Sequence, residues 1–350
     1  MNELTKYLWP TIKVLIVPYV LLMFLLIYRI DYQIIAPGGI TEVESLIDVD
    51  YEVDESKGSF SSTYVISFRK PTFFQFIISD FSKYNKVYIL SESYAHYTDS
   101  EVRQISYIQK YTSIDAAVKV AYEYASEVNS EIVFGEDAIF NVTIVYGKDA
   151  ELMHYDSIGL GDEFVSMVGD ENVVIDDITL VSSAMTEGNV YKFLFKEEDG
   201  TMYEAEVSAT DFLSSNIQFR TYTLINENAI YPTYQETDSN IGGPSGGLLQ
   251  TLAIYNMLVD EDMTKGYKIA GTGTISYDGQ VGQIGGMTQK IATAHINQVD
   301  YFFVPGTTTS NYLEALAACE KYGIDPEGWL IPVETFSEAV AFLEGLDANE

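Results

Sequence analysis

Three scarcities limit what this 350-residue chain can be. Cysteine occurs once, at Cys319, so no intramolecular disulfide and no cysteine-rich metal site can form. Three scattered histidines, His96, His154 and His295, do not suggest a zinc enzyme. There are 19 basic residues against 52 acidic ones, and the net charge of −33 argues against nucleic acid or an anionic membrane surface as a partner. We therefore expect no metal and no cofactor.

Nucleotide-binding motifs are also missing. No Gly-x-x-x-x-Gly-Lys-Ser/Thr loop occurs, which excludes a nucleotide-driven motor of that type. The run Gly271-Thr272-Gly273 lacks the third glycine and the helix start of a dinucleotide-binding fingerprint. The sequence therefore predicts that no nucleotide is a partner.

The one long apolar run lies near the N-terminus. Residues 14–28 carry no charge, and with the Lys13 amine reaching toward the interface, the apolar span of residues 8–30 is long enough to cross a bilayer. No small-residue cleavage site follows, so we expect a retained anchor in contact with the lipid bilayer rather than a removed signal. The flanking charges favour an inside N-terminus. The sequence thus predicts a single-pass protein of the cell membrane whose C-terminal domains are extracytoplasmic; a buried soluble helix and an inverted topology are the alternatives.

The rest of the chain divides into regions that differ in their pattern of strand-like and helix-like segments. The hydrophobic content of 47% is enough for real cores, and the length suggests two or three domains. After the anchor (1–35), the Pro-Gly-Gly of residues 36–39 indicates a linker that opens a membrane-proximal region (36–130). That region contains a strand at 62–68 and a helix at 114–128, and it is open whether its strands belong to the C-terminal domain.

Short strands separated by turns follow in residues 131–212, a β module. We expect strands at 132–134, 140–145, 163–167, 191–195 and 203–207, with a hairpin turn at 198–200. Residues 213–350 alternate strand and helix, which predicts an α/β domain. Its expected strands are 217–224, 267–271, 274–276, 301–304 and 329–333, and its expected helices are 245–258, 288–297, 311–322 and 336–346.

Two glycine-rich turns in this α/β domain carry the candidate chemistry. Ser245 lies in Gly-Gly-Pro-Ser-Gly-Gly before an apolar helix, and Lys290 follows Gly285-Gly286 at the start of another. A serine hydroxyl is a poor nucleophile without an adjacent base, and a lysine can be that base where a dry site lowers its pKa. This pairing favours a Ser–Lys hydrolase.

The order and spacing of these motifs resemble the proteolytic domain of Lon proteases. The resemblance covers residues 235–350: Gly-Pro-Ser-Gly-Gly at 243–247, Gly-Thr-Gly-Thr-Ile at 271–275, and Asp-Gly through Gly-Gly to the lysine at 278–290. It implies that Ser245 and Lys290 are catalytic and that the hydroxyl of Thr272 binds the lysine. The family usually has alanine where Gly246 stands. At a helix start, the main-chain N–H groups of Gly243 and Ser245 are candidates for an oxyanion hole.

A second resemblance concerns the β module. Residues 158–170 resemble the Leu, Gly-Asp, strand, Gly core of PDZ domains, which bind extended peptides on a sheet edge. The arrangement of anchor, PDZ-like module and Lon-like domain is similar to the membrane-anchored PDZ–Lon proteins of Gram-positive bacteria, the YlbL/SepM type. It implies an ATP-independent endopeptidase acting on extracytoplasmic peptides or flexible protein segments, for example a secreted signalling peptide. The oligomeric state is open, with a homo-oligomer as one alternative.

Two other interpretations remain. A Gly-x-Ser-x-Gly turn also marks the nucleophile of α/β-hydrolases, but the one histidine after Ser245 is His295, on the same helix as Lys290 and five residues on. The other alternative is a non-catalytic scaffold that binds peptides through the PDZ-like module.

Overall fold

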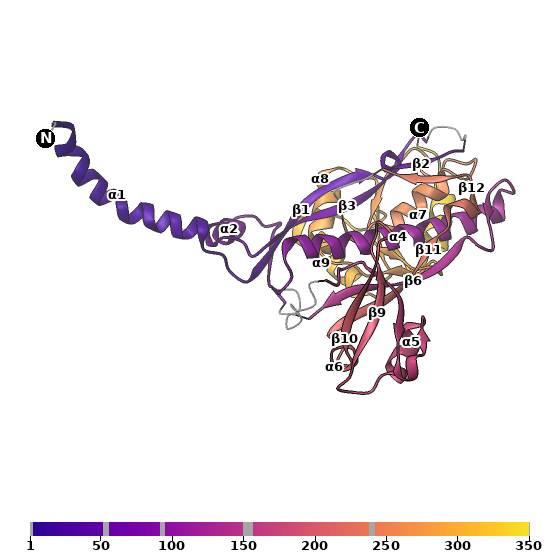
Figure 1. Ribbon diagram of the computed structural model, residues 1–350. Coiled ribbons are helices and arrows are strands. Elements are labelled where there is room, and N and C mark those ends of the chain that lie inside the picture. Colours follow the sequence, from indigo (N-terminus) through magenta and orange to yellow (C-terminus); the bar gives the residue numbers. More distant parts are fainter. Residues whose placement is uncertain (1–2, 52–55, 92–94, 150–156, 238–241, 350) are drawn as a thin grey trace.

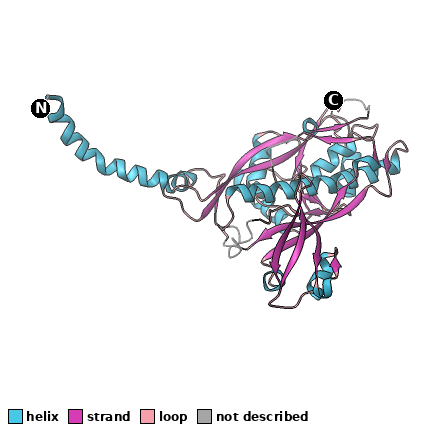
Figure 2. Cartoon of the chain, viewed as in Figure 1, coloured by secondary structure: helices cyan, strands magenta, loops and turns pink. Residues whose placement is uncertain are grey.

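The structure is a computed structural model that describes residues 3–51, 56–91, 95–149, 157–237 and 242–349 (Figures 1 and 2). A long helix, α1 (Glu3–Ile27), projects from a body built around two sheets. His154 lies outside the described residues.

The larger sheet joins strands from both ends of the chain. Its order is β18 (Leu330–Val333), β17 (Tyr301–Pro305), β14 (Lys268–Gly271), β3 (Ser59–Arg69), β1 (Tyr32–Glu42) and β4 (Lys86–Ile89). The first four strands are parallel, while β1 runs antiparallel to both β3 and β4. Because β3 pairs directly with β14, residues 59–69 lie in the same sheet as the C-terminal strands.

Helices cover both faces of this sheet. They are α4 (Asp99–Val128), α7 (Gly247–Asn256), α8 (Met287–Ile296), α9 (Ser310–Tyr322) and α10 (Phe336–Glu344). Side chains alternate along β17: Phe303 packs into the core with α4, α7 and α10, whereas Phe302 and Val304 pack with α8 and α9. The expected α/β alternation of the C-terminal region is confirmed, with α8 and α9 each connecting two parallel strands.

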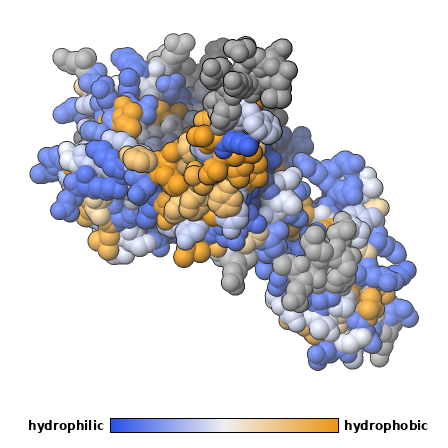
Figure 3. All heavy atoms as spheres, turned by 90° about the vertical axis from the view of Figure 1, so that its left-hand side faces the viewer, coloured by the Kyte–Doolittle hydropathy of each residue, from blue (hydrophilic) through white to orange (hydrophobic). Residues whose placement is uncertain are grey.

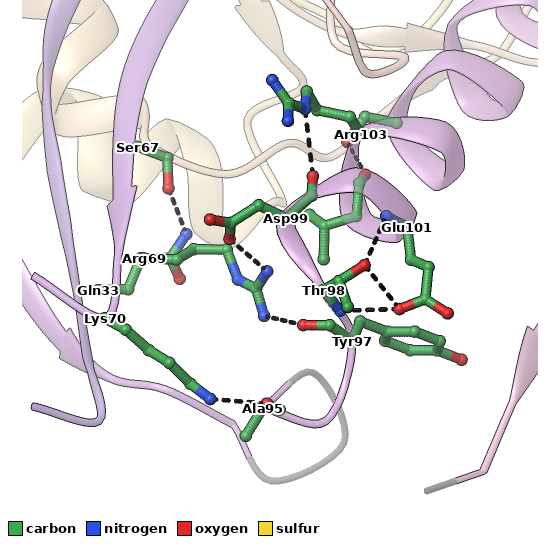
Figure 4. A network of polar contacts seen from close by, with 12 residues as sticks. Gln33, Ser67, Arg69, Lys70, Ala95, Tyr97, Thr98, Asp99, Glu101 and Arg103 are labelled. Atoms are coloured by element: carbon green, nitrogen blue, oxygen red, sulfur yellow. Dashed lines mark hydrogen bonds and ion pairs between the residues drawn. The ribbon is translucent and has the colours of Figure 1, made fainter. Parts of the chain in front are cut away.

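Helix α4 begins fifteen residues earlier than the periodicity of residues 114–128 predicts. Thr98 closes a capping box with Glu101, and Arg69 at the end of β3 donates to the Tyr97 carbonyl and pairs with Asp99 at 3.2 Å (Figure 4). The second half of α4 is largely buried, whereas the first half has polar and exposed positions that hide its helical period. The local capping box and the tertiary contacts of Arg69 together set the start of this helix.

The second sheet corresponds to the predicted β module. Its order is β10 (Met202–Ser208), β9 (Val190–Lys196), β7 (Glu163–Val168), β6 (Ile139–Lys148) and β11 (Ile217–Ile225), and β8 (Val174–Ile175) pairs with β7. Four of the five predicted strands lie in this sheet, and the hairpin turn at Gly200 is confirmed. The fifth, predicted at 132–134, pairs with residues 230–231 outside this sheet. The boundary predicted at residue 212 assigns β11 to the C-terminal α/β domain, yet β11 pairs with β6 along its whole length.

Shorter elements complete the chain. They are α2 (Phe73–Ser79), α5 (Ile178–Val181), α6 (Ala209–Leu213), the pairs β2 (Ile47–Val49) with β13 (Tyr234–Glu236), β5 (Val133–Phe134) with β12 (Ile230–Tyr231) and β15 (Thr274–Ile275) with β16 (Val281–Gly282), and 3-10 turns at Glu44–Leu46, Asp170–Asn172, Ser182–Ala184 and Glu227–Ala229.

Two expectations for the N-terminal region are not met. Among the described residues, none of the helices combines the length and apolar character needed to span a bilayer, so the transmembrane helix predicted at residues 8–30 is not found; the helical backbone ends at Ile27, just before β1. The expected linker at residues 36–39 lies inside β1, where a bulge interrupts the pairing between Pro37 and Ile40. Its glycines are required by packing, because a Cβ on Gly38 would come within 2.5 Å of the Tyr64 carbonyl oxygen.

This packing predicts that Gly38→Ala destabilises the protein, although a linker glycine would tolerate the change. The clash involves main-chain atoms, so the strand must shift, and we expect a loss of about 1–3 kcal/mol in the free energy of unfolding. Denaturant unfolding measures it. Gly345→Ala is the matched control, because its Cβ would meet no atom closer than 3.4 Å. Equal stability of the two variants would contradict the placement of residue 38 in β1.

Candidate active site

Ser245 lies in the tight turn that leads into α7. The turn folds because its glycines fit where side chains do not: Gly243 has a φ of +90°, and a Cβ on Gly247 would lie 2.7 Å from the Ser113 hydroxyl of α4. Helix α7 begins at Gly247, two residues later than the start predicted at Ser245. The serine thus precedes the first helical turn, and its side chain is left clear of the helix.

Lys290 is in the first turn of α8, which begins after Gly286 in the left-handed conformation (φ +73°). The helix packs against β1 and β3, and a Cβ on Gly286 would lie 3.1 Å from Val65. This packing leaves Lys290 only 2% exposed. A lysine so deeply buried is rare, and it requires partners for its amine.

Three oxygen atoms surround the Lys290 amine. Its Nζ lies 2.8 Å from the Ser245 Oγ, 2.9 Å from the Thr272 Oγ1 and 2.8 Å from the main-chain carbonyl oxygen of Thr63. The structure therefore brings together the three residues that the sequence singled out, and it adds a fourth group from β3.

The protons of this cluster can be assigned from the chemistry of its groups. The Thr272 hydroxyl donates its one proton to the Ser245 carbonyl at 2.9 Å, so it can only accept from Lys290. The Thr63 carbonyl is also an acceptor only. A neutral amine then donates one N–H to Thr272 and the other to Thr63, and its lone pair accepts the proton of the Ser245 hydroxyl. This arrangement favours proton transfer from the serine to the lysine.

Burial makes the neutral amine available near physiological pH. Desolvation lowers the pKa of Lys290 from its usual 10.5 to about 7, because the surrounding protein cannot solvate the ammonium form as water does. An ion pair with a carboxylate would raise the pKa of Lys290 again, but among the described residues no carboxylate forms one with it. At pH 7 a large share of the amine is therefore uncharged.

The main chain of Ser245 is held as firmly as its side chain. Its carbonyl accepts from the Thr272 hydroxyl and from the N–H of Gly273 at 2.9 Å. Thr272 follows β14 directly and is fully buried, so one residue contacts both the lysine and the serine. This double contact fixes the distance between the turn before α7 and the start of α8.

A cavity of about 620 Å³ opens on this cluster. One wall is the glycine-rich turn, and another is β3 from Ser62 to Ser67; Val43 and Leu46 add apolar surface. Glu236 pairs there with Lys110 of α4 at 2.8 Å, with both side chains about nine-tenths buried. The site is thus a pocket with a strand along one side, large enough for several residues of an extended peptide.

One of the two expected oxyanion-hole donors is not available. The N–H of Gly243 donates to the Ser106 carbonyl at 2.8 Å, because α4 extends further toward its N-terminus than predicted and places Ser106 beneath the turn. The N–H groups of Ser245 and Gly246 make no such bond within the described part of the chain. They are therefore the pair that can receive a developing negative charge.

The Lon family usually has alanine at the position of Gly246, and the neighbouring Ser62 explains why glycine stands here. A Cβ at this position would lie 2.7 Å from the Ser62 Oγ of β3. The sequence did not indicate this contact, or the Thr63 carbonyl and the Lys110–Glu236 pair, because each involves residues more than a hundred positions apart. His295 is exposed at the end of α8 and does not line the pocket, so the Ser–His–Asp alternative gains nothing from the structure.

The comparisons with known proteins agree with this geometry. No curated protein matches the chain. Residues 180–321 match the family model of the Lon protease (S16) C-terminal proteolytic domain. The matched segment contains Ser245, Thr272 and Lys290, whereas β1, β3 and α4 lie before it. Residues 180–321, less than half of the chain, are thus similar to the C-terminal proteolytic domain of Lon proteases, a match that is consistent with serine peptidase chemistry in this segment.

Proposed function

We propose that the protein is an ATP-independent serine endopeptidase in which Ser245 is the nucleophile and Lys290 the general base. The observation that carries the proposal is the 2.8 Å contact between the Ser245 hydroxyl and a buried lysine amine of lowered pKa. The absence of a phosphate-binding loop in the sequence supports independence from ATP.

The reaction follows from the proton assignment. Lys290 takes the proton of the Ser245 hydroxyl as its oxygen attacks the substrate carbonyl carbon. The resulting ammonium donates to Thr63, Thr272 and the leaving amine, which departs with the proton. Water then hydrolyses the acyl-enzyme by the same route. Thr272 is the positioning residue, since it holds both partners, and the N–H groups of Ser245 and Gly246 stabilise the tetrahedral oxyanion.

The free edge of β3 supports a peptide substrate in extended form. β14 pairs with β3 only up to Ser62, and no described strand takes this edge beyond it. The Thr63 carbonyl points away from β1 toward Lys290, so Val65, two residues on, directs its N–H and C=O to the same side. A substrate strand can bind these groups and place its scissile carbonyl near Ser245.

The second sheet is proposed as a PDZ-like module that presents substrate. A cavity of about 1080 Å³ lies between α4 and this sheet, lined by residues such as Tyr107, Gly161 and Glu163. Since α4 also lines the active-site pocket, a peptide held here would be close to the chemistry. An enzyme without an unfolding motor can bind only substrates that are already extended or flexible. We therefore propose that the substrates are flexible peptides or protein segments, such as a secreted signalling peptide, that fit into these two cavities.

We also propose attachment to the cell membrane through α1, with the body outside the cytoplasm. The described side chains from Ile12 to Ile27 are nearly all apolar and exposed, and the helix stands away from the body (Figure 1). Such a surface is unfavourable in water. Protease digestion of intact cells would test the sidedness, because only an external body is cleaved without breaking the membrane.

Removing either member of the pair tests the peptidase. We expect Ser245→Ala and Lys290→Ala each to lower kcat/KM on a peptide library, without ATP, by about 10³-fold or more. Lys268→Ala, an exposed lysine of β14, is the control that keeps activity. Equal cleavage by all variants would remove the pair from the mechanism; peptide binding without cleavage by the wild type would favour the scaffold alternative.

The pH profile tests the state of Lys290. Because the base must be neutral, kcat/KM should rise about tenfold per pH unit below the lysine pKa and level off above about pH 7. Circular dichroism at each pH shows that the fold is intact. A profile that is flat from pH 5.5 to about 8.5, or that falls through neutrality, would contradict a lysine base.

The contact at Gly246 gives a double-variant test. Gly246→Ala forces its Cβ against the Ser62 hydroxyl and displaces the turn that carries Ser245, so we expect kcat/KM to fall about tenfold, equivalent to about 1.4 kcal/mol. Adding Ser62→Ala removes the clashing oxygen and should restore most of the activity. Ser62→Ala alone is the control. If the second change rescues nothing, the loss has another cause.

A further inference from the structure

The face of the molecule from which α1 projects shows a patch of hydrophobic residues, to which α1, pointing toward the viewer, contributes (Figure 3). Side chains outside α1 add to the apolar character of this face. On α2 and the turn after it, Phe74, Ile77, Ile78 and Phe81 are exposed at the three- and four-residue spacing of one helix face. Ile89 of the edge strand β4 adds to them. We call these five residues the α2 surface. Phe81 is 85% exposed and Ile89 78%, values that are unusual for side chains of this kind in water.

The α2 surface is fixed to the end of α1. The N–H of Phe73 donates to the Tyr28 carbonyl at 2.9 Å, and Arg29 bridges to Thr72. The rings of Phe76 and Tyr32 lie 5.1 Å apart, and Tyr32 pairs with Ile89 across β1 and β4. These contacts make the base of α1, α2 and the end of β4 one structural unit. Wherever α1 enters an apolar phase, the α2 surface lies at its boundary.

The local charge differs from that of the whole chain. Residues 69–89 hold four basic residues and one acidic residue, whereas the whole chain holds 19 basic and 52 acidic ones. Two of the four, Arg69 and Lys86, form ion pairs with Asp99 and Glu314. Lys83 and Lys86 are exposed, and their amines lie 5.0 Å from the ring centroids of Tyr84 and Tyr88. Exposed apolar side chains beside lysines and tyrosines are typical of proteins that lie in the headgroup layer of a bilayer. The remaining acidic surface opposes such contact elsewhere.

We propose that the α2 surface is a second membrane contact, which inserts into the interfacial layer of the lipid bilayer and holds the body against the membrane. This inference rests on the proposed membrane attachment through α1 and adds a defined orientation to it. The contact is made by side chains outside α1, and it leaves the active-site pocket untouched, because none of the five residues lines that pocket.

Site-specific fluorophores on the full chain test this contact. Cys319 is buried and is replaced by alanine, after which Phe81→Cys and Ile89→Cys each carry a single NBD label. Val174→Cys is the matched control, since Val174 is an apolar residue, 65% exposed, on the second sheet. The protein is mixed with vesicles of phosphatidylcholine and phosphatidylglycerol, with and without a nitroxide-bearing lipid, and vesicle binding is followed by flotation.

We expect a blue shift of NBD emission and quenching by the nitroxide lipid at residues 81 and 89, with neither at residue 174. If the protein floats with vesicles but residues 81 and 89 do not respond, the α2 surface is overturned and attachment through α1 stands. Responses without vesicles that grow with protein concentration would assign the surface to self-association and overturn the proposal as well. If nothing floats, the membrane attachment itself fails, while peptide cleavage by the soluble protein is unaffected.

Discussion

Burial of one uncharged amine is the constraint on which the site depends. Lys290 can be enclosed near neutral pH because burial lowers its pKa to about 7, so that a large share of the amine is uncharged, and because three oxygens lie within hydrogen-bond distance of its Nζ. Two of those oxygens can only accept, which directs the lone pair to the Ser245 hydroxyl. In the proposed mechanism, the same desolvation that is costly for the fold makes Lys290 a base and Ser245 a nucleophile.

The surrounding architecture follows from the need to hold three distant segments at this point. The turn before α7, the residue after β14 and the first turn of α8 each contribute one side chain, and β3 contributes a carbonyl from the other end of the chain. Glycines allow the backbones to approach closely, as at Gly247 against α4 and Gly286 against β3. Because β3 both contacts Lys290 and borders the pocket, the N-terminal strands take part in the site.

Local signals predicted much of this molecule. Strong alternation revealed the strands of the β module, and the helical periods of residues 288–297 and 311–322 matched α8 and α9 within one residue. They failed where long-range contacts decide: the Pro-Gly-Gly run at 36–39 is typical of a linker, yet pairing with β3 makes it a bulged strand. The start of α4 was missed because the first half of the helix is polar. Because α4 is longer than predicted, the Ser106 carbonyl accepts from the N–H of Gly243, which leaves the N–H groups of Ser245 and Gly246 as the available oxyanion-hole donors.

The sequence by itself determined which side chains could react, since residue type and the glycine turns around Ser245 and Lys290 define a nucleophile and a base whatever their distance. The tertiary structure alone decided that the amine is buried, that Thr63 supplies its second acceptor, and that a Cβ on Gly246 would lie against the Ser62 hydroxyl. The reason is physical: pKa and steric fit depend on what packs around a group, and those neighbours come from strands and helices far away in the sequence.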